Sequence, residues 1–158
     1  MKILIVYYSR TGVTRKLADY LAKKINAETE EIKDTVNRAG VVGYLLAGRD
    51  GMKRRLTKLE PLKLNPADFD LTIIGTPIWS WNMSAPARTY LENYKSQFKK
   101  VAFFCTMGGS GDETAFREMS GITGKKPMAT LSLKTKEVVT GDFSKADKFC
   151  TEIMNTAI

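Results

Sequence analysis

Histidine is absent from the 158-residue sequence, and only two cysteines, Cys105 and Cys150, are present. Without histidine, Ser-His-Asp and Cys-His catalysis and the zinc sites that need a histidine ligand are excluded. Two cysteines far apart in the chain form neither a disulfide framework nor a metal-binding motif. We therefore expect reduced thiols, a cytoplasmic protein, no bound metal and no catalytic side chain.

Long hydrophobic runs are also missing. No window approaches the ~20 apolar residues of a membrane-spanning helix, and the N-terminus leads directly into a predicted strand without the pattern of a signal peptide. We expect no membrane span. The length and the 43% of hydrophobic residues are those of a globular domain, which we expect to cover residues 1–158 as a single unit.

Negative charge is scarce, since 17 acidic residues face 25 Lys and Arg, for a net charge of +8. Such a surplus favours anionic partners, nucleic acid among them. The basic residues are scattered over many segments, as on solvated helix faces, and we expect no nucleic-acid binding. One basic stretch, Lys53, Arg54, Arg55 and Lys58, either docks an acidic partner or is a solvated loop.

Short apolar runs alternate with helical patterns along the chain. The runs at 3–8, 71–75 and 101–105 predict strands buried on both faces, and 28–32 and 128–133 are weaker candidates. Helices are predicted over 13–25, after Ser84 as N-cap, after Ser110 in a capping box, after Ser144 as N-cap, and within 36–60. This alternation predicts an α/β protein with three layers, a parallel sheet between two layers of helices.

Three loops leave predicted strand ends, where open parallel sheets bind their ligands. The first, Ser9 to Thr14, puts hydroxyls and a glycine at a helix start, where free N–H groups and the helix dipole attract anions. The dinucleotide-binding and P-loop patterns are absent, so the predicted ligand is a terminal phosphate monoester. A capped turn without a ligand is the alternative.

The second loop, "TPIWSWNMS", holds Trp79 and Trp81 where we expect incomplete burial. A tryptophan outside the core usually covers a flat group, although packing on a helix or a partner subunit is the alternative. The third loop, "TMGGSGD", has glycines that let backbone amides approach a ligand, or that form a flexible turn. Together the loops fit a flat heterocycle that carries a phosphate.

In these residues the sequence resembles the flavodoxin family in its short-chain form. The family's signature (S/T)-x-T-G-x-T matches Ser9, Thr11, Gly12 and Thr14. The stretch Gly75 to Trp79 is similar to the family's second flavin loop, and the Gly-rich stretch after Cys105 takes the place of the third. The resemblance runs through the whole chain, and it implies a doubly wound five-stranded parallel sheet of order 2-1-3-4-5 and noncovalently held FMN.

The resemblance implies that FMN is bound by all three loops, with Trp79 ahead of Trp81 as the residue that stacks on the flavin. The expected cofactor-binding residues are Ser9, Arg10, Thr11, Gly12, Val13, Thr14, Thr76, Pro77, Ile78, Trp79, Ser80, Trp81, Asn82, Thr106, Met107, Gly108, Gly109, Gly111 and Asp112.

The function implied is electron transfer between redox partners, by a monomer or weak dimer. An NAD(P)H-dependent quinone reductase of the same fold and a flavin-free anion-binding module remain alternatives, with a carrier favoured over an enzyme. The chain departs from electron-carrying flavodoxins in being basic, and "GYLLAGRDGMKRRL" resembles a branch that includes quinone reductases.

Overall fold

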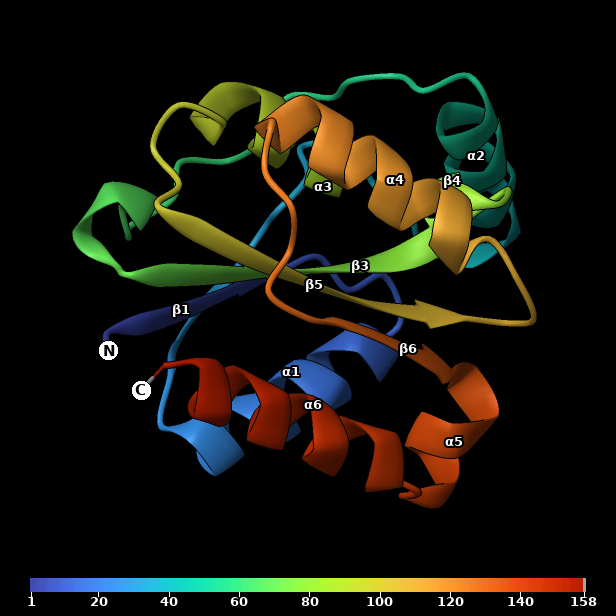
Figure 1. Ribbon diagram of the computed structural model, residues 1–158. Helices are drawn as coiled ribbons and strands as arrows, with labels where there is room; N and C mark the ends of the chain where they lie inside the picture. The colour runs from blue at the N-terminus through green and yellow to red at the C-terminus, as the bar shows by residue number, and fades with distance from the viewer. Residues whose placement is uncertain (158) are drawn as a thin grey trace.

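The computed structural model describes residues 1–157, which form a twisted parallel sheet between two layers of helices (Figure 1). The strands are β1 (Ile3–Tyr7), β2 (Glu28–Glu31), β3 (Leu71–Trp79), β5 (Lys100–Met107) and β6 (Thr130–Lys134), in the order β2-β1-β3-β5-β6. In chain order these parallel strands read 2-1-3-4-5, so the predicted topology is confirmed. A short extra strand, β4 (Asn82–Met83), pairs antiparallel with the end of β3.

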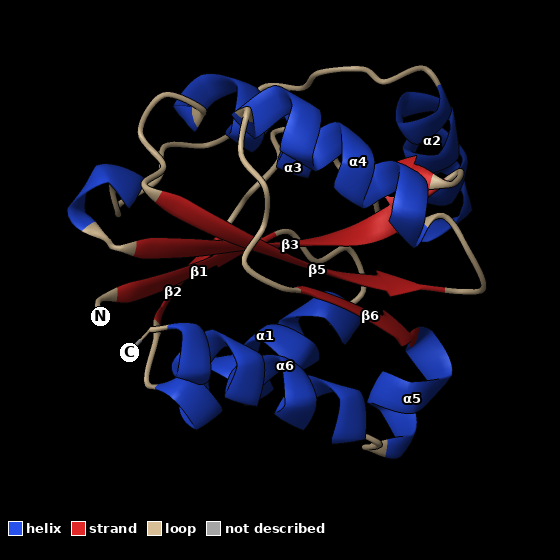
Figure 2. Cartoon of the chain, viewed as in Figure 1, coloured by secondary structure: helices blue, strands red, loops and turns tan. Residues whose placement is uncertain are grey.

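The helices divide between the two faces of the sheet (Figures 1 and 2). One face carries α1 (Val13–Ile25), α5 (Thr135–Thr140) and α6 (Ser144–Thr156), and the other carries α2 (Gly40–Met52), α3 (Ala85–Tyr94) and α4 (Asp112–Thr123). A short 3-10 turn, η1 (Pro66–Asp68), precedes β3. Helix α5 was not expected from the sequence. None of the helices in residues 1–157 combines the length and the apolarity needed to cross a membrane.

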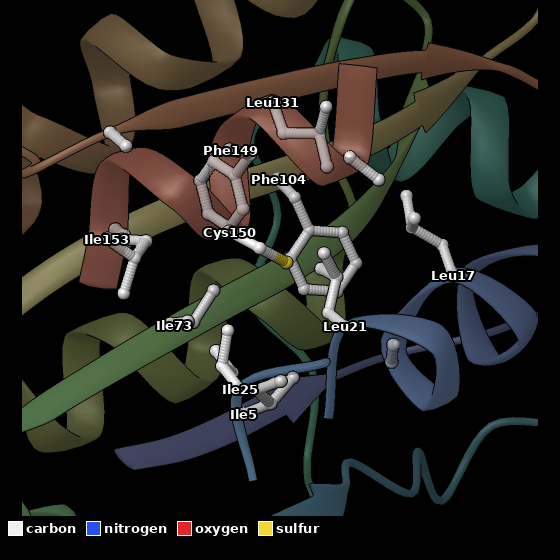
Figure 3. Close-up of a cluster of buried hydrophobic side chains, with 14 of the residues drawn as sticks. Ile5, Leu17, Leu21, Ile25, Ile73, Phe104, Leu131, Phe149, Cys150 and Ile153 are labelled. Atoms are coloured by element: carbon white, nitrogen blue, oxygen red, sulfur yellow. The ribbon is translucent and has the colours of Figure 1, made fainter. Parts of the chain in front are cut away.

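The continuous apolar runs form central strands because both of their faces are covered. The protein has two hydrophobic cores, one on each face of the sheet, and alternate residues of β1 point into different cores. Ile5 lies in the cluster beneath α1 and α6, whereas Leu4 lies in the cluster beneath α2, α3 and α4. Figure 3 shows the first cluster, in which Phe104 of β5 lies among side chains of α1 and α6. The two cores hold the carboxyl ends of β1, β3 and β5 at one edge of the sheet.

Two expected helix caps are wrong, and one is confirmed. Ser84 accepts a hydrogen bond from the Ala87 amide at 3.3 Å, as an N-cap should. Ser110 does not cap α4, because the chain turns at Gly111, in a left-handed conformation, and the helix begins at the next residue. Ser144 is the first residue of α6, and its amide is bound by the Asp142 carboxylate.

Candidate functional site

A cavity of about 670 Å³ opens at the carboxyl ends of β1, β3 and β5, where an open parallel sheet is expected to bind its ligand. Three of its walls come from the three predicted loops and α2 supplies a fourth, which was not predicted. The expected residues that line it are Arg10, Thr11, Val13, Thr14, Pro77, Ile78, Trp79, Ser80, Thr106, Met107 and Gly108. The cavity lining does not include Ser9, Gly12, Thr76, Trp81, Asn82, Gly109, Gly111 or Asp112.

The first loop is folded around the hydroxyl oxygen of Ser9, which accepts hydrogen bonds from the amides of Gly12 (3.0 Å) and Arg15 (3.2 Å). Gly12 has φ 96°, a left-handed conformation that glycine adopts without steric cost, and α1 begins directly after it. The hydrogen bonds of residues 1–157 leave the amides of Val13 and Thr14 without an acceptor. Free amides at the positive end of the helix dipole favour an anion at this position.

The first and third loops are joined by a pair of threonines. The hydroxyls of Thr14 and Thr106 lie 2.8 Å apart, and both side chains are almost fully buried. The sequence predicted that Thr14 offers its hydroxyl to a ligand, whereas in this structure that hydroxyl bonds to the neighbouring loop. Thr11 and Thr135 are exposed threonines in the cavity lining, and Thr11 belongs to the first loop.

The second loop is a hairpin and not an open loop. Strand β3 continues to Trp79, the chain reverses at Ser80 and Trp81 with φ values of 49° and 65°, and β4 pairs back onto β3. Two central residues with positive φ are typical of a type I′ turn. The turn is tied to α2 by a hydrogen bond from Ser80 Oγ to the Gly48 carbonyl (2.8 Å). Thr76 and Asn82 are buried inside the hairpin, where Thr76 Oγ1 lies 3.0 Å from Ser84 Oγ.

The hairpin places the two tryptophans differently, so the expectation that both are incompletely buried is wrong. Trp79 is only 6% exposed, because the extended strand carries it under α2, and it forms part of the cavity wall. Trp81 is 67% exposed at the tip of the turn. That Trp79 stacks on a flavin stays a prediction, and the buried indole of Trp79 lines the cavity in which the flavin would lie.

Trp79 is held by a buried ion cluster that the sequence did not reveal. The guanidinium of Arg38 lies over the indole ring, 4.9 Å from its centroid. Asp34 and Asp50 bind that guanidinium at 2.6 and 2.7 Å, and all three side chains are buried. Burial by itself would raise the pKa of Asp50, but hydrogen bonds from Arg38 and Arg49 hold that pKa below its usual range. The i,i+4 spacing of Asp34 and Arg38 was the available signal.

Glycines let these segments approach closely. A Cβ at Gly51 would collide with the backbone of Trp79, so only glycine allows α2 to lie against the hairpin. Gly111 has φ 113°, and a Cβ there would lie 2.6 Å from the Cα of Trp81. The Asp112 carboxylate accepts a hydrogen bond from Ser132 Oγ (2.7 Å). Gly111 and Asp112 therefore support the third loop, and Gly108 is its glycine in the cavity wall.

Helix α2 gives the cavity an apolar wall with a positive rim. Tyr44, Leu45 and Met52 line it, and Arg49 lies beside them. The guanidinium of Arg10 stands 5.6 Å from the centroid of the Tyr44 ring. The lining contains no carboxylate. The apolar letters of "GVVGYLL" were the only trace of this wall in the sequence.

Cys105 of β5 does not line the cavity. Burial raises the pKa of the Cys105 thiol to about 12, so it is not a nucleophile at neutral pH. Within residues 1–157 there is no group of three or more Cys, Asp or Glu side chains placed to hold a metal ion. What the cavity offers is a site for an anion at the start of α1 and apolar walls for a flat group.

Comparison with known proteins gives a consistent picture. A sequence model of the family described as Flavodoxin matches residues 2–148. The chain is 26% identical over 117 residues to an NAD(P)H dehydrogenase (quinone) from Chromohalobacter salexigens; the match covers 72% of this chain but only 57% of that relative.

Solved structures share the fold. A flavoprotein from Lactobacillus acidophilus NCFM, crystallised in complex with FMN, superposes with a TM-score of 0.74 at 23% identity, covering 94% of this chain and 97% of that one. A flavodoxin from Streptococcus pneumonia TIGR4 superposes with a TM-score of 0.58 at 13% identity, covering 99% of both chains.

Proposed function

The chain belongs to the flavodoxin family, and from that premise we propose that it binds FMN noncovalently in the cavity and transfers electrons between redox partners. The observation that carries the proposal is that the start of α1, the end of β3 and the loop after β5 meet around one cavity. When bound, FMN supplies one- and two-electron transfer, and the protein supplies binding, orientation and local charge.

The residues present fit a phosphate monoester at the start of α1. The free amides of Val13 and Thr14 donate to it, and the exposed Thr11 hydroxyl adds a donor. Arg10 lines the same side of the cavity and contributes positive charge. In this proposal Ser9 and Gly12 act on the loop itself, since the Ser9 oxygen holds the turn from which these donors emerge.

A flat ring system fits between the other walls. Trp79 is immobilised by Arg38 and by an edge-on contact with Tyr8, whose ring centroid is 5.5 Å away. The backbone from Thr106 to Gly108 forms another part of the lining, where main-chain groups can bind a ring edge. Tyr44 and Leu45 of α2 give the cavity an apolar side that a bound ring can contact.

A second candidate function is the NAD(P)H-dependent reduction of quinones. It is supported by the similarity to the quinone dehydrogenase and by the apolar wall of α2, which suits a flat uncharged acceptor. Oxidation of NADPH by the purified holoprotein in the presence of a quinone separates the enzyme from the carrier. If the purified protein is colourless and binds no added flavin, both flavin-dependent functions are excluded, and the flavin-free anion-binding module is the remaining alternative. Redox partners, a cytoplasmic location and a monomeric or weakly dimeric state are parts of the same proposal.

The experiment compares FMN with riboflavin, which lacks the phosphate. Thr11→Ala should weaken FMN binding by about 10- to 150-fold, because a hydrogen bond to a charged group contributes roughly 1.5–3 kcal/mol. Riboflavin binding should be unchanged. Thr29→Ala, at an exposed threonine on β2, is the control and should alter neither affinity. Release of FAD on denaturation, or equal losses for both ligands, would overturn the proposal.

A further inference from the structure

Helix α2 turns its large apolar side chains away from the protein. Its buried positions are Gly43, Ala47, Asp50 and Gly51. Its exposed positions include Val41, Val42, Tyr44, Leu45 and Met52, and Val41 and Val42 are 77% and 71% exposed. A surface helix normally buries its apolar stripe, so this arrangement is the reverse of the usual one.

The reason for the small buried face lies in the backbone packing. A Cβ at Gly43 would collide with the backbone of Arg38, and one at Gly51 would collide with Trp79. The helix therefore sits too close to its neighbours to bury large side chains. The core beneath α2 is already filled by Trp79 and Ala47, so it has no space for the large apolar side chains on the outer face of the helix.

The same surface carries only positive charge at its exposed positions. We call the exposed side chains of residues 41–56 the α2 surface. It includes Arg49, Lys53 and Arg55, and its single carboxylate, Asp50, is buried, with its Oδ1 atom 2.9 Å from Arg49 and 4.0 Å from Arg55. The neighbouring Glu118 is paired with Arg54 and Arg88 at 2.6 Å each. An apolar helix face bordered by basic residues is typical of helices that lie in a membrane interface.

We propose that the α2 surface docks the protein on an anionic lipid bilayer. Val41, Val42 and Leu45 enter the boundary between headgroups and acyl chains, and the basic side chains contact headgroup phosphates. The helix has 13 residues, and it lies at the end of the molecule away from the N- and C-terminal ends (Figure 1). Because Tyr44, Leu45 and Met52 also line the cavity, docking turns the mouth of the cavity toward the bilayer. The docking itself requires no flavin.

Charge argues against a second copy of this chain as the occupant. A symmetric contact between two chains of net charge +8 would set this surface against its own copy, and the exposed charged side chains of the surface are all basic. The exposed Trp81 favours lipid over an acidic protein. It stands on the turn that Ser80 ties to Gly48 of α2, and tryptophan is enriched at membrane interfaces.

The test is flotation of the purified full chain with vesicles of phosphatidylcholine alone and of phosphatidylcholine mixed equally with phosphatidylglycerol. We expect binding to the mixed vesicles only, weakened when the ionic strength rises from about 0.05 to about 0.5 M. Lys53→Ser with Arg55→Ser should lower the affinity roughly 25-fold, about fivefold for each charge. Val41→Ser with Val42→Ser, which lie outside the cavity lining, should lower it at least about tenfold.

The matched control removes the same charge from the opposite side of the sheet. Lys23→Ser with Lys148→Ser, at exposed positions of α1 and α6, should bind as the unchanged protein does. Flavin absorbance and the thermal midpoint should be the same in all variants, so a failed docking test is distinguishable from a failed flavin proposal. Absent flotation, equal binding to neutral vesicles, or an equal loss in the control pair would each overturn the proposal. So would self-association, measured by sedimentation, that the valine variant abolishes.

Discussion

The Thr14–Thr106 hydroxyl pair gives a prediction whose size follows from the geometry. The two oxygens are 2.8 Å apart and buried, so each hydroxyl has the other as its partner. Valine keeps the shape of threonine but leaves the remaining hydroxyl buried and unpaired, at a cost of about 1–3 kcal/mol. Thr14→Val and Thr106→Val should therefore each lower the free energy of unfolding by that amount. The double variant should lose less than the sum of the two.

The assay is urea denaturation of the flavin-free protein followed by circular dichroism, because a bound ligand adds stability of its own. Thr130→Val, at an exposed position on β6, is the control and should change the free energy of unfolding by less than about 0.5 kcal/mol. Additive losses in the double variant, or single variants as stable as the control, would refute the coupling between the two hydroxyls.

The same variants separate two roles for the Thr14 side chain. If it joins the loops, as the geometry indicates, both substitutions should weaken FMN binding by the same factor, because each loosens the same contact. A loss confined to Thr14→Val, with riboflavin binding intact, would show instead that this hydroxyl reaches the phosphate, as the sequence pattern predicted.

Three further outcomes are expected. Arg38→Met should lower the free energy of unfolding by about 3–5 kcal/mol, because it removes the cation that pairs with the buried Asp34 and one of the arginines that bind Asp50. Burial by itself would raise the pKa of Asp50, but the hydrogen bonds from Arg38 and Arg49 together outweigh burial, and the pKa lies below its usual value. The stability that the ion pairs of Asp50 contribute is therefore present above about pH 4 and is lost as the pH falls through the lowered pKa; urea titrations at several pH values will check it. Gly111→Ala should cost about 2–5 kcal/mol from its left-handed backbone and its contact with Trp81, measured by thermal unfolding. FMN should quench tryptophan emission, and Trp79→Phe, unlike the same change at Trp81, should remove most of the quenching.

Control variants at exposed or open positions test the reasons given for the Arg38 and Gly111 predictions. Arg15→Met removes an exposed pair with Glu31 and should cost less than about 1 kcal/mol. Gly109→Ala places a Cβ where no atom lies within 4 Å, and should be tolerated. A stability gap for Arg38→Met that stays constant from pH 7 to about pH 2 would contradict the lowered pKa. Quenching that survives Trp79→Phe would assign the contact to Trp81.

Local sequence determined the sheet and the position of the site. The apolar runs of β1, β3 and β5 have no polar face, so they must lie in the middle of a covered sheet, and the helical patterns between them leave only parallel pairing. The hydroxyls and glycine after β1 then fall at the strand end and helix start, a position that favours an anion. These signals depend on neighbours within a few residues, and they survive in any compatible packing.

Tertiary contacts decided the rest. Ser80 and Trp81 give no local signal for positive φ, since the turn is held by α2 through Gly48. The burial of Trp79 also depends on α2, because Gly51 lies against it. Arg38 is buried because a carboxylate on another element neutralises it. The outward apolar face of α2 follows from the same close approach. Hydrophobic periodicity finds an apolar face, but the space beside the helix decides whether that face turns inward or outward.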